Sequence, residues 1–463
     1  MPNVQRTLSP IDGHLVAERS LASDQEIASA LVRAEGAQAL WKHESLGQRI
    51  AVCRRFAEIM KVQREELGQE ITLQMGRPSR YVAGEIDGLV DRAATMCDLA
   101  ETQLADVVLP PKTGFIRSIR REPVGVVFAI VPWNYPYLTA VNTVIPALLA
   151  GNSVILKHSP QTPLCAERIH EVLVDAGLPE GIFQFLHLSD NSAEALVRNP
   201  AIDFVSFTGS VGVGRKLEQA AAGRFIGLGL ELGGKDAAYV RADADVAFAV
   251  ENIVDGICFN SGQSCCAVER VYVHTDVYDE FVAEAASLAS RYVLGDPRDP
   301  ATTLGPVVSA RSAAFIRSQV AEAIAAGAKP LVDENLFPKS APGSLYVAPQ
   351  LLVDVDHSMS LMRDETFGPV AGIMRVPSDE EALALINDSE FGLTASVWTS
   401  DLAAAQRLGD CAEVGTWFMN RCDYLDPLLA WTGVKNSGHG CTLSEFGFDQ
   451  LTRPKSFHFR THP

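Results

Sequence analysis

Two adjacent cysteines, Cys265 and Cys266, follow a Gly-Gln-Ser turn in the stretch GICFNSGQSCCAVER. The thiolate form of cysteine is a nucleophile, and it is favoured by partial exposure, a cationic neighbour or a helix N-terminus. Free cysteine is also among the most buried residue types, so packing is the competing interpretation for either thiol. The stretch on its own therefore indicates a candidate nucleophilic cysteine, but it does not decide which of the two thiols that is.

Two other segments carry polar groups suited to work beside a nucleophile. Glu231 ends an apolar run in LELGGK, where burial would raise its pKa and let it act as a general base on water. Asn134 lies between two prolines in PWNYP and offers an amide suited to stabilising an oxyanion. A salt-bridged structural glutamate and an asparagine that caps its loop are the alternatives.

A third segment, FTGSVGVG, has the form of a phosphate-binding turn. Phe207 ends an apolar run, Gly209 and Ser210 form a turn, and Gly214 falls in the first turns of the expected helix. Free backbone N–H groups at a helix N-terminus bind phosphate, although an ordinary strand-to-helix turn fits the pattern equally well. The G-x-G-x-x-G fingerprint of dinucleotide-binding proteins is missing from any strand-turn-helix context in the sequence.

The elements that would position these residues follow from the alternation of apolar runs and helical periodicity. From Val124 onward the expected strands are VGVVFAIV, NSVILK, IFQFLHL, IDFVSF and IGLGLEL, with helices such as YLTAVNTVIPALLAG between them. Repeated strand-helix-strand units predict an α/β fold with a parallel doubly wound sheet. A second α/β stretch is expected from Gly234 to the GVKNSG segment.

The two ends of the chain differ from this pattern. The first hundred residues are expected to be helical, with a capping box from Ser23 to Glu26. The segment VVLPPKTGFIRSIRREPVG predicts an extended hairpin, and LTRPKSFHFR an extended tail.

Composition excludes several classes of protein. The 463 residues include 57 acidic and 39 basic side chains, a net charge of −18 that argues against a nucleic-acid surface. The segment 124–156 has no charged residue, but three prolines interrupt it, so buried strands and a helix are expected there and no membrane span. Nine dispersed cysteines without zinc-site spacing, and no signal peptide, predict free thiols, no metal site and a cytoplasmic location.

Six motifs in sequence order, PWN, LK before SPQTP, FTGS, ELGGK, GQSC and ETFGPV, resemble those of the aldehyde dehydrogenase superfamily. The resemblance extends from about Arg6 to Phe459. It implies a Rossmann-like cofactor domain without the glycine fingerprint (1–104 and 124–233) and an α/β catalytic domain (234–445). It also implies a small β oligomerisation element (105–123 and 446–463) and assembly into a homodimer or homotetramer.

The resemblance also implies a role for each matching residue. Cys265 would attack the aldehyde, Asn134 and the Cys265 N–H would hold the oxyanion of the thiohemiacetal, and Glu231 would activate the water that hydrolyses the thioester. The implied cofactor is NAD or NADP, and the residues expected to contact it are Trp133, Lys157, Ser159, Gly209, Ser210, Gly214, Glu365 and Phe367.

Three departures from the family pattern leave questions open. Pro160 stands where NAD-preferring relatives carry a glutamate three residues after the ribose-binding lysine, so the preference between NAD and NADP is undecided. Arg453 occupies a position where many relatives have a proton-relaying glutamate, and Trp431-Thr432-Gly433 replaces a commoner Phe-Gly-Gly. Two rival functions remain, a CoA-acylating dehydrogenase, against which Glu231 counts, and a non-catalytic protein that retains the fold. The identity of the aldehyde is not predicted.

Overall fold

The computed structural model describes residues 4–461, and the chain begins with a hairpin followed by four helices. The hairpin consists of β1 (Val4–Leu8) and β2 (Leu15–Ser20). The helices are α1 (Asp24–Trp41), α2 (Leu46–Val62), α3 (Arg64–Met75) and α4 (Ser79–Gln103). The capping box is confirmed, since Ser23 and Glu26 each bond the other's backbone N–H.

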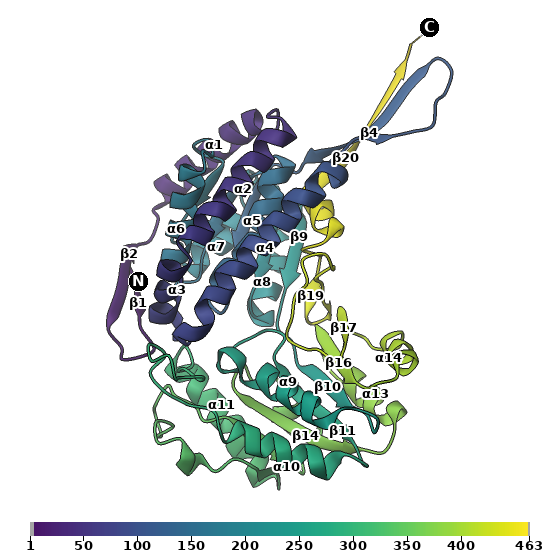
Figure 1. Cartoon of the computed structure of the whole chain (residues 1–463). Helices are drawn as coiled ribbons and strands as arrows, with labels where there is room; N and C mark the ends of the chain where they lie inside the picture. Colours follow the sequence, from purple (N-terminus) through teal and green to yellow (C-terminus); the bar gives the residue numbers. More distant parts are fainter. Residues whose placement is uncertain (1–3, 462–463) are drawn as a thin grey trace.

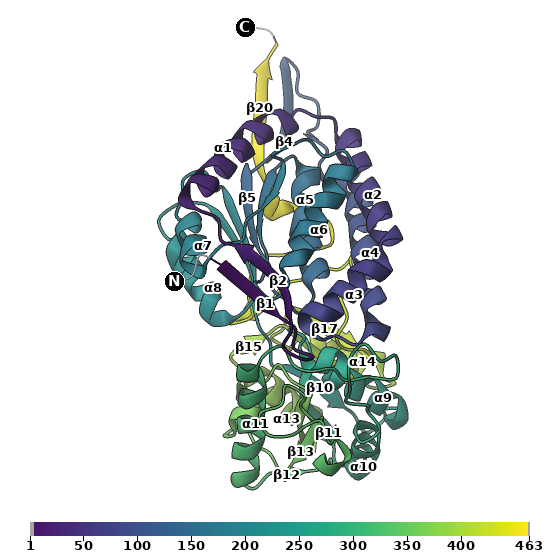
Figure 2. The same cartoon turned by 90° about the vertical axis from the view of Figure 1, so that its left-hand side faces the viewer.

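The expectation of helix was wrong for the N-terminal hairpin. Its strands are short and only partly buried, so they lack the continuous apolar run that marks the central strands. The hairpin turn reaches the second half of the chain, where Tyr346 Oη donates to the Ile11 carbonyl at 3.4 Å (Figure 2).

The first large sheet confirms the predicted doubly wound α/β pattern. Its order is β19-β9-β8-β5-β6-β7, and every pair is parallel except β19 with β9. The strands are β5 (Val126–Ile130), β6 (Ser153–Lys157), β7 (Phe183–Phe185), β8 (Phe204–Thr208), β9 (Gly227–Glu231) and β19 (Gly438–His439). The helices between them are α5 (Pro136–Ala150), α6 (Pro163–Asp175), α7 (Asp190–Val197) and α8 (Val211–Ala221).

The uncharged segment 124–156 forms β5, α5 and β6 of this sheet, as predicted. Its helix is buried along almost its whole length, and Gly151 ends it in the left-handed conformation that glycine adopts readily. The Trp41 indole donates to the Leu148 carbonyl at 2.9 Å and fastens α1 against this helix. Among the described residues, no helix is both long and apolar enough to cross a membrane.

A second, seven-stranded sheet follows in the order β12-β13-β14-β11-β10-β16-β17, with β12 antiparallel. Figure 1 labels its strands β10, β11, β14, β16 and β17 in the lower part of the molecule. Its strands are β10 (Asp236–Val240), β11 (Val268–His274), β12 (Lys329–Pro330), β13 (Gln350–Val353), β14 (Val370–Val376), β16 (Thr394–Trp398) and β17 (Thr416–Met419). Its helices are α9 (Val246–Cys258), α10 (Tyr278–Ala289), α11 (Ala310–Ala325), α12 (Ser360–Arg363), α13 (Asp379–Asn387) and α14 (Leu402–Gly409).

Minor elements complete the chain. A small pair joins β15 (Phe391–Gly392) to β18 (Val434–Lys435). The short 3₁₀ helices are η1 (Phe259–Gly262), η2 (Glu334–Leu336) and η3 (Glu445–Leu451).

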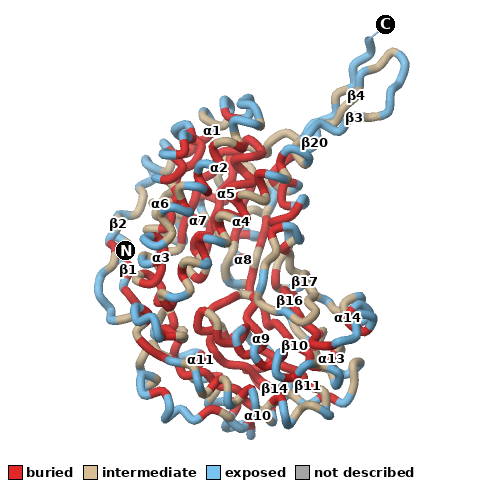
Figure 3. Tube along the Cα trace, viewed as in Figure 1, coloured by how far each residue is buried: buried red, intermediate tan, exposed pale blue. Residues whose placement is uncertain are grey.

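A narrow β arm projects from the first half of the molecule (Figures 1 and 2). It consists of β3 (Val107–Val108), β4 (Phe115–Pro123) and β20 (Thr452–Arg460), in the order β20-β4-β3. The predicted hairpin is therefore present, but its longest pairing joins β4 to the C-terminal strand. Most of the arm is exposed (Figure 3).

Candidate active site

The segment that carries both cysteines begins with a strained loop between α9 and β11. Asn260, Ser261 and Gly262 follow one another with φ values of 53°, 57° and 70°, a left-handed conformation that side chains disfavour. A Cβ atom at Gly262 would lie 2.1 Å from the carbonyl carbon of Gly368, so only glycine fits. Residues held in such conformations persist where the surroundings enforce them, and they gather at functional sites.

The structure separates the two thiols. Both cysteines border a cavity of about 240 Å³, but Cys265 is half-buried whereas Cys266 is 2% exposed. The Cys266 Sγ donates to Asp423 Oδ1 at 3.0 Å, and Ser264 Oγ donates to the same oxygen at 2.8 Å. Hydrogen bonding with the Cys265 side chain, and then burial, raise the pKa of Cys266. Cys265 is therefore the more accessible of the two thiols, and the Cys266 thiol is already engaged by Asp423.

Glu231 lines the same cavity as Cys265, at the end of β9. Its carboxylate accepts two hydrogen bonds, from Thr442 Oγ1 to Oε1 at 2.5 Å and from Thr208 Oγ1 to Oε2 at 3.1 Å. Burial raises the pKa of Glu231, and the two hydroxyls and the charge of Arg92 oppose that rise. Glu231 thus combines a raised pKa with a position on the cavity that Cys265 also lines, which are the properties that the predicted general base needs.

Asn134 is 4% exposed and lies against the loop 259–267, which carries the predicted nucleophile Cys265 and is called the nucleophile loop below. Its Nδ2 donates to the Gln263 carbonyl at 3.2 Å, two residues before Cys265. The backbone carbonyl of Asn134 accepts hydrogen bonds from Asn260 Nδ2 at 3.2 Å and from the Arg77 guanidinium. One hydrogen of the amide is thus used to fix its position beside the nucleophile, and the second is left for another acceptor.

The residues predicted to bind a cofactor lie mainly at one edge of the first sheet. Trp133 follows β5, Lys157 ends β6, and Gly209 and Ser210 follow β8. Because these strands are parallel and adjacent, their carboxyl ends meet at the same edge, where open α/β sheets bind their ligands.

Two of these side chains have unused polar groups. Lys157 is 6% exposed, and burial lowers its pKa. Among residues 4–461, the only ion partner of its Nζ is the Asp190 carboxylate at 4.0 Å. Ser210 caps the N-terminus of α8 without a side-chain hydrogen bond to the helix. A buried ammonium and a free helix N-terminus suit the ribose and phosphates of a dinucleotide.

Glu365 and Phe367 reach this edge from the loop before β14. Glu365 Oε1 accepts from the Gly234 N–H at 3.1 Å, and a Cβ atom at Gly233 would lie 2.3 Å from that oxygen. Burial, and then the nearby Glu269 carboxylate, raise the pKa of Glu365 to about 8.

Phe367, with a φ of 55°, packs its ring edge-on against Trp133 at 5.7 Å. The structure therefore brings Trp133, Glu365 and Phe367 to one place.

Ser159 and Gly214 have local roles in the structure. The Ser159 hydroxyl accepts from the Gln161 N–H at 3.3 Å. A Cβ atom at Gly214 would lie 2.7 Å from Leu232, so this glycine allows α8 to approach the end of β9.

Several buried charged residues support the site and were not identified from the sequence. Lys235 Nζ donates to Glu269 at 2.5 Å, and Glu269 also accepts from the backbone N–H groups of Thr366 and Phe367. The pair therefore fixes the loop that carries Glu365. No local sequence pattern signals such a pair, because its members are far apart in the chain.

A second group of this kind holds Asn134 in place. Arg77 forms a buried ion pair with Glu85, and its Nε donates to Asn260 Oδ1 at 3.0 Å. Glu85 also accepts from the Tyr137 N–H at 2.8 Å at the start of α5. This pair therefore joins the nucleophile loop to the helix that follows Asn134.

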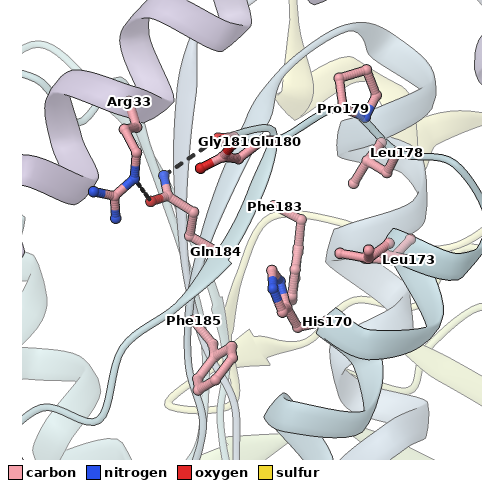
Figure 4. A pocket seen from close by; sticks show the side chains of 11 residues that line it. Arg33, His170, Leu173, Leu178, Pro179, Glu180, Gly181, Phe183, Gln184 and Phe185 are labelled. Carbon is pink, nitrogen blue, oxygen red and sulfur yellow. Dashed lines mark hydrogen bonds between the residues drawn. The ribbon is translucent and has the colours of Figure 1, made fainter.

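A larger hollow of about 530 Å³ lies elsewhere, at the β7 edge of the first sheet (Figure 4). His170, Phe183 and Phe185 form its wall, and Arg33 donates to Gln184 at 3.0 Å beside it. None of the predicted catalytic or cofactor residues lines it. The smaller cavity beside Cys265 is therefore the candidate active site.

Comparison with known proteins agrees with this geometry. The profile of the aldehyde dehydrogenase family matches residues 2–457. The chain belongs to the aldehyde dehydrogenase family. It is an NAD(P)-dependent enzyme that oxidises an aldehyde to a carboxylic acid through a cysteine thiohemiacetal and thioester.

The relatives of this aldehyde dehydrogenase include enzymes of known activity. Succinate-semialdehyde dehydrogenase [NADP(+)] of Mycobacterium avium (strain 104) is 35% identical over 97% of the chain and 95% of the relative. The enzyme of the same name from Deinococcus radiodurans is 36% identical over 97% and 93%.

Among solved structures, succinic semialdehyde dehydrogenase from Streptococcus pyogenes in complex with NADP+ superposes with a TM-score of 0.94. It is 28% identical, covering 98% of this chain and all of that one. The mixed α/β architecture of this aldehyde dehydrogenase is thus that of its relatives.

Proposed function

We propose that this dehydrogenase oxidises a short aldehyde that carries a carboxylate, such as succinate semialdehyde, with Cys265 as its nucleophile. The observation that carries the assignment of the nucleophile is that, of the two thiols beside the cavity that Glu231 lines, Cys265 is half-buried, while Cys266 is almost fully buried and donates its hydrogen to Asp423. The substrate class is supported by the relatives named above, which are succinate-semialdehyde dehydrogenases.

The reaction begins when the Cys265 thiolate attacks the aldehyde carbon. The free Asn134 amide hydrogen and the Cys265 N–H stabilise the resulting oxyanion. A dinucleotide held by the residues named in the next paragraph would supply, through its oxidised nicotinamide, the acceptor for the hydride that the thiohemiacetal loses. Glu231 then takes a proton from water, which attacks the thioester and releases the acid and the thiol.

The cofactor is held by residues that suit a dinucleotide. Lys157 and Ser159 serve the adenosine ribose, and Gly209, Ser210 and Gly214 the pyrophosphate, together with Trp133. Glu365 and Phe367 serve the nicotinamide ribose and ring. Pro160 offers no carboxylate to a 2′-hydroxyl and no repulsion to a 2′-phosphate, so NADP is the preferred form.

The test of the nucleophile compares two single variants under the same conditions. Cys265→Ala is expected to abolish reduction of NADP with succinate semialdehyde, while Cys266→Ala keeps most of it. Activity that survives in Cys265→Ala, or loss confined to Cys266→Ala, contradicts the assignment. Product analysis with and without CoA checks the hydrolytic outcome, since a CoA thioester as the only product would contradict the role of Glu231.

The test of cofactor preference introduces the missing carboxylate. Pro160→Glu is expected to lower kcat/KM for NADP at least 10-fold relative to NAD, because a charged carboxylate repels a phosphate and accepts a 2′-hydroxyl. An unchanged ratio would show that another residue sets the preference.

The same proposal assigns a function to each segment of the chain. Segments 1–104 and 124–233 bind the cofactor, 234–445 carries catalysis, and 105–123 with 446–463 joins subunits into a homodimer or homotetramer. Exposed apolar residues on the arm support assembly: Val107, Val108, Ile116 and Phe459. Light scattering that finds a stable monomer would contradict it.

Nine free thiols favour a reducing compartment, the cytoplasm.

A further inference from the structure

Arg92 is a charged residue inside the active-site cavity that contacts no reacting group in the reaction just described, although its charge opposes the rise in the pKa of Glu231. It comes from α4, is 8% exposed, and lines the same cavity as Cys265 and Glu231. An arginine is almost never buried without an anion, because moving its charge out of water costs several kcal/mol.

The hydrogen bonds of Arg92 leave half of the guanidinium unused. Nη1 donates to Asn142 Oδ1 at 2.9 Å and to the Leu138 carbonyl at 3.2 Å. Within residues 4–461, Nε and Nη2 have no hydrogen-bond acceptor, and neither atom is closed off from open space. No carboxylate lies within ion-pair distance of Arg92 in that range, in contrast to the buried Arg77, which is paired with Glu85.

The other charged groups of the cavity are occupied or peripheral. Asp423 accepts from Ser264 and Cys266, and Glu231 accepts from two threonine hydroxyls. Asp91 is exposed on the neighbouring position of α4. Arg92 therefore presents an unsatisfied pair of parallel N–H donors, a geometry that fits both oxygens of a carboxylate.

We propose that the Nε and Nη2 atoms of Arg92 bind the carboxylate at the far end of the aldehyde substrate, and that this contact makes the enzyme select semialdehydes over uncharged aldehydes. Asn142 holds the guanidinium in place from its other side. The cavity of about 240 Å³ is smaller than most ligand pockets, so the selected semialdehydes are short.

This inference deepens the proposed function and rests on Cys265 as the nucleophile. The experiment compares kcat/KM for succinate semialdehyde and for butanal, an aldehyde of equal chain length without the carboxylate, in the wild type and in Arg92→Met. The wild type should prefer succinate semialdehyde at least 10-fold. Arg92→Met should lose about 10- to 100-fold in kcat/KM for succinate semialdehyde, the loss expected for hydrogen bonds to a charged group, and change less than about twofold with butanal.

A matched control removes the same charge from the same helix outside the cavity. Arg80 is exposed on α4, and Arg80→Met should leave both values within about twofold of the wild type. Arg92→Lys keeps a charge but not the planar pair of donors, so it should recover only part of the activity with succinate semialdehyde.

Each contrary outcome has a distinct meaning. Equal losses with both aldehydes in Arg92→Met would overturn the inference, because Arg92 would then act on a step common to both aldehydes and not on the substrate carboxylate. A wild type that does not prefer succinate semialdehyde, or that prefers a cationic amino aldehyde, would overturn it even if no variant folds. If Cys265→Ala stays active, the proposed function itself fails, and that result is read without reference to Arg92.

Discussion

The hydrogen bond from Thr442 to Glu231 offers a direct test of how the general base is tuned. Thr442→Val keeps the shape of the side chain and removes the hydroxyl that donates to Oε1 at 2.5 Å. The backbone of Thr442 stays paired with Trp431 through hydrogen bonds of 2.9 and 3.0 Å, so the substitution should leave the chain path unchanged. The perturbation is therefore confined to the charged form of Glu231.

The size of the effect follows from the chemistry of that bond. A hydrogen bond to a charged group contributes about 1.5–3 kcal/mol, and about 1.4 kcal/mol corresponds to one pH unit. The Thr208 bond at 3.1 Å remains, which favours the lower end of this range. Because the lost donor stabilised the carboxylate, the pKa of Glu231 rises further, and the acid limb of the kcat profile moves up by about one pH unit.

The assay is the pH dependence of kcat together with the first turnover in a rapid-mixing experiment. Hydrolysis of the thioester needs the ionised base, whereas the preceding steps do not. Thr442→Val should therefore keep a fast first turnover of cofactor reduction and slow the steady state at neutral pH, with recovery at higher pH. Thr442→Ser retains the donor and should behave as the wild type.

Two results would refute this reasoning. One is an acid limb that stays in place in Thr442→Val, since the bond would then not influence the base. The other is an equal shift in Thr442→Ser, since the effect would then come from packing.

Two further predictions concern the framework of the site. Glu269→Gln leaves the buried Lys235 ammonium without its partner at 2.5 Å, and should lower the free energy of unfolding by about 3–5 kcal/mol in a urea titration. An unchanged midpoint would contradict the importance of the pair. Gly262→Ala introduces a side chain at a φ of 70° and against Gly368, and should cost more than about 1–2 kcal/mol. Gly36→Ala, in open space within α1, should instead raise the melting temperature slightly, and equal effects of the two substitutions would rule out the steric argument.

The parts of the fold that could be predicted are the strands and helices whose burial is visible in the local pattern of apolar residues. Strands β5, β6 and β8 are buried on both faces, so they read as continuous apolar runs, and Gly151 ends the helix between them. The hairpin of β1 and β2 could not be predicted in this way, because its short strands mix apolar and charged residues and lie at the surface.

The candidate site also has a part that could be predicted from the sequence and a part that could not. Residue types and motif order identified Cys265, Glu231 and Asn134 as candidates, and those roles stay predictions until the variants are measured. The contacts that tune them could not be predicted, since Thr442 lies 211 positions from Glu231 in the chain. The unpaired state of Arg92 depends likewise on which side chains do not reach it in space.

The segment from Glu231 to Lys235 explains how a base and a nucleophile from different sheets are held at a fixed separation. Glu231 ends a strand of the first sheet, and Lys235 is anchored by Glu269 of the second. A Cβ atom at Gly234, between them, would lie 2.6 Å from the carbonyl oxygen of Cys265. The two glycines of ELGGK are thus required by close approach on both sides, to Glu365 at the cofactor edge and to the nucleophile. A side chain at either position would displace Glu231 relative to Cys265, so the connection between the two sheets sets the separation on which the proposed hydrolysis depends.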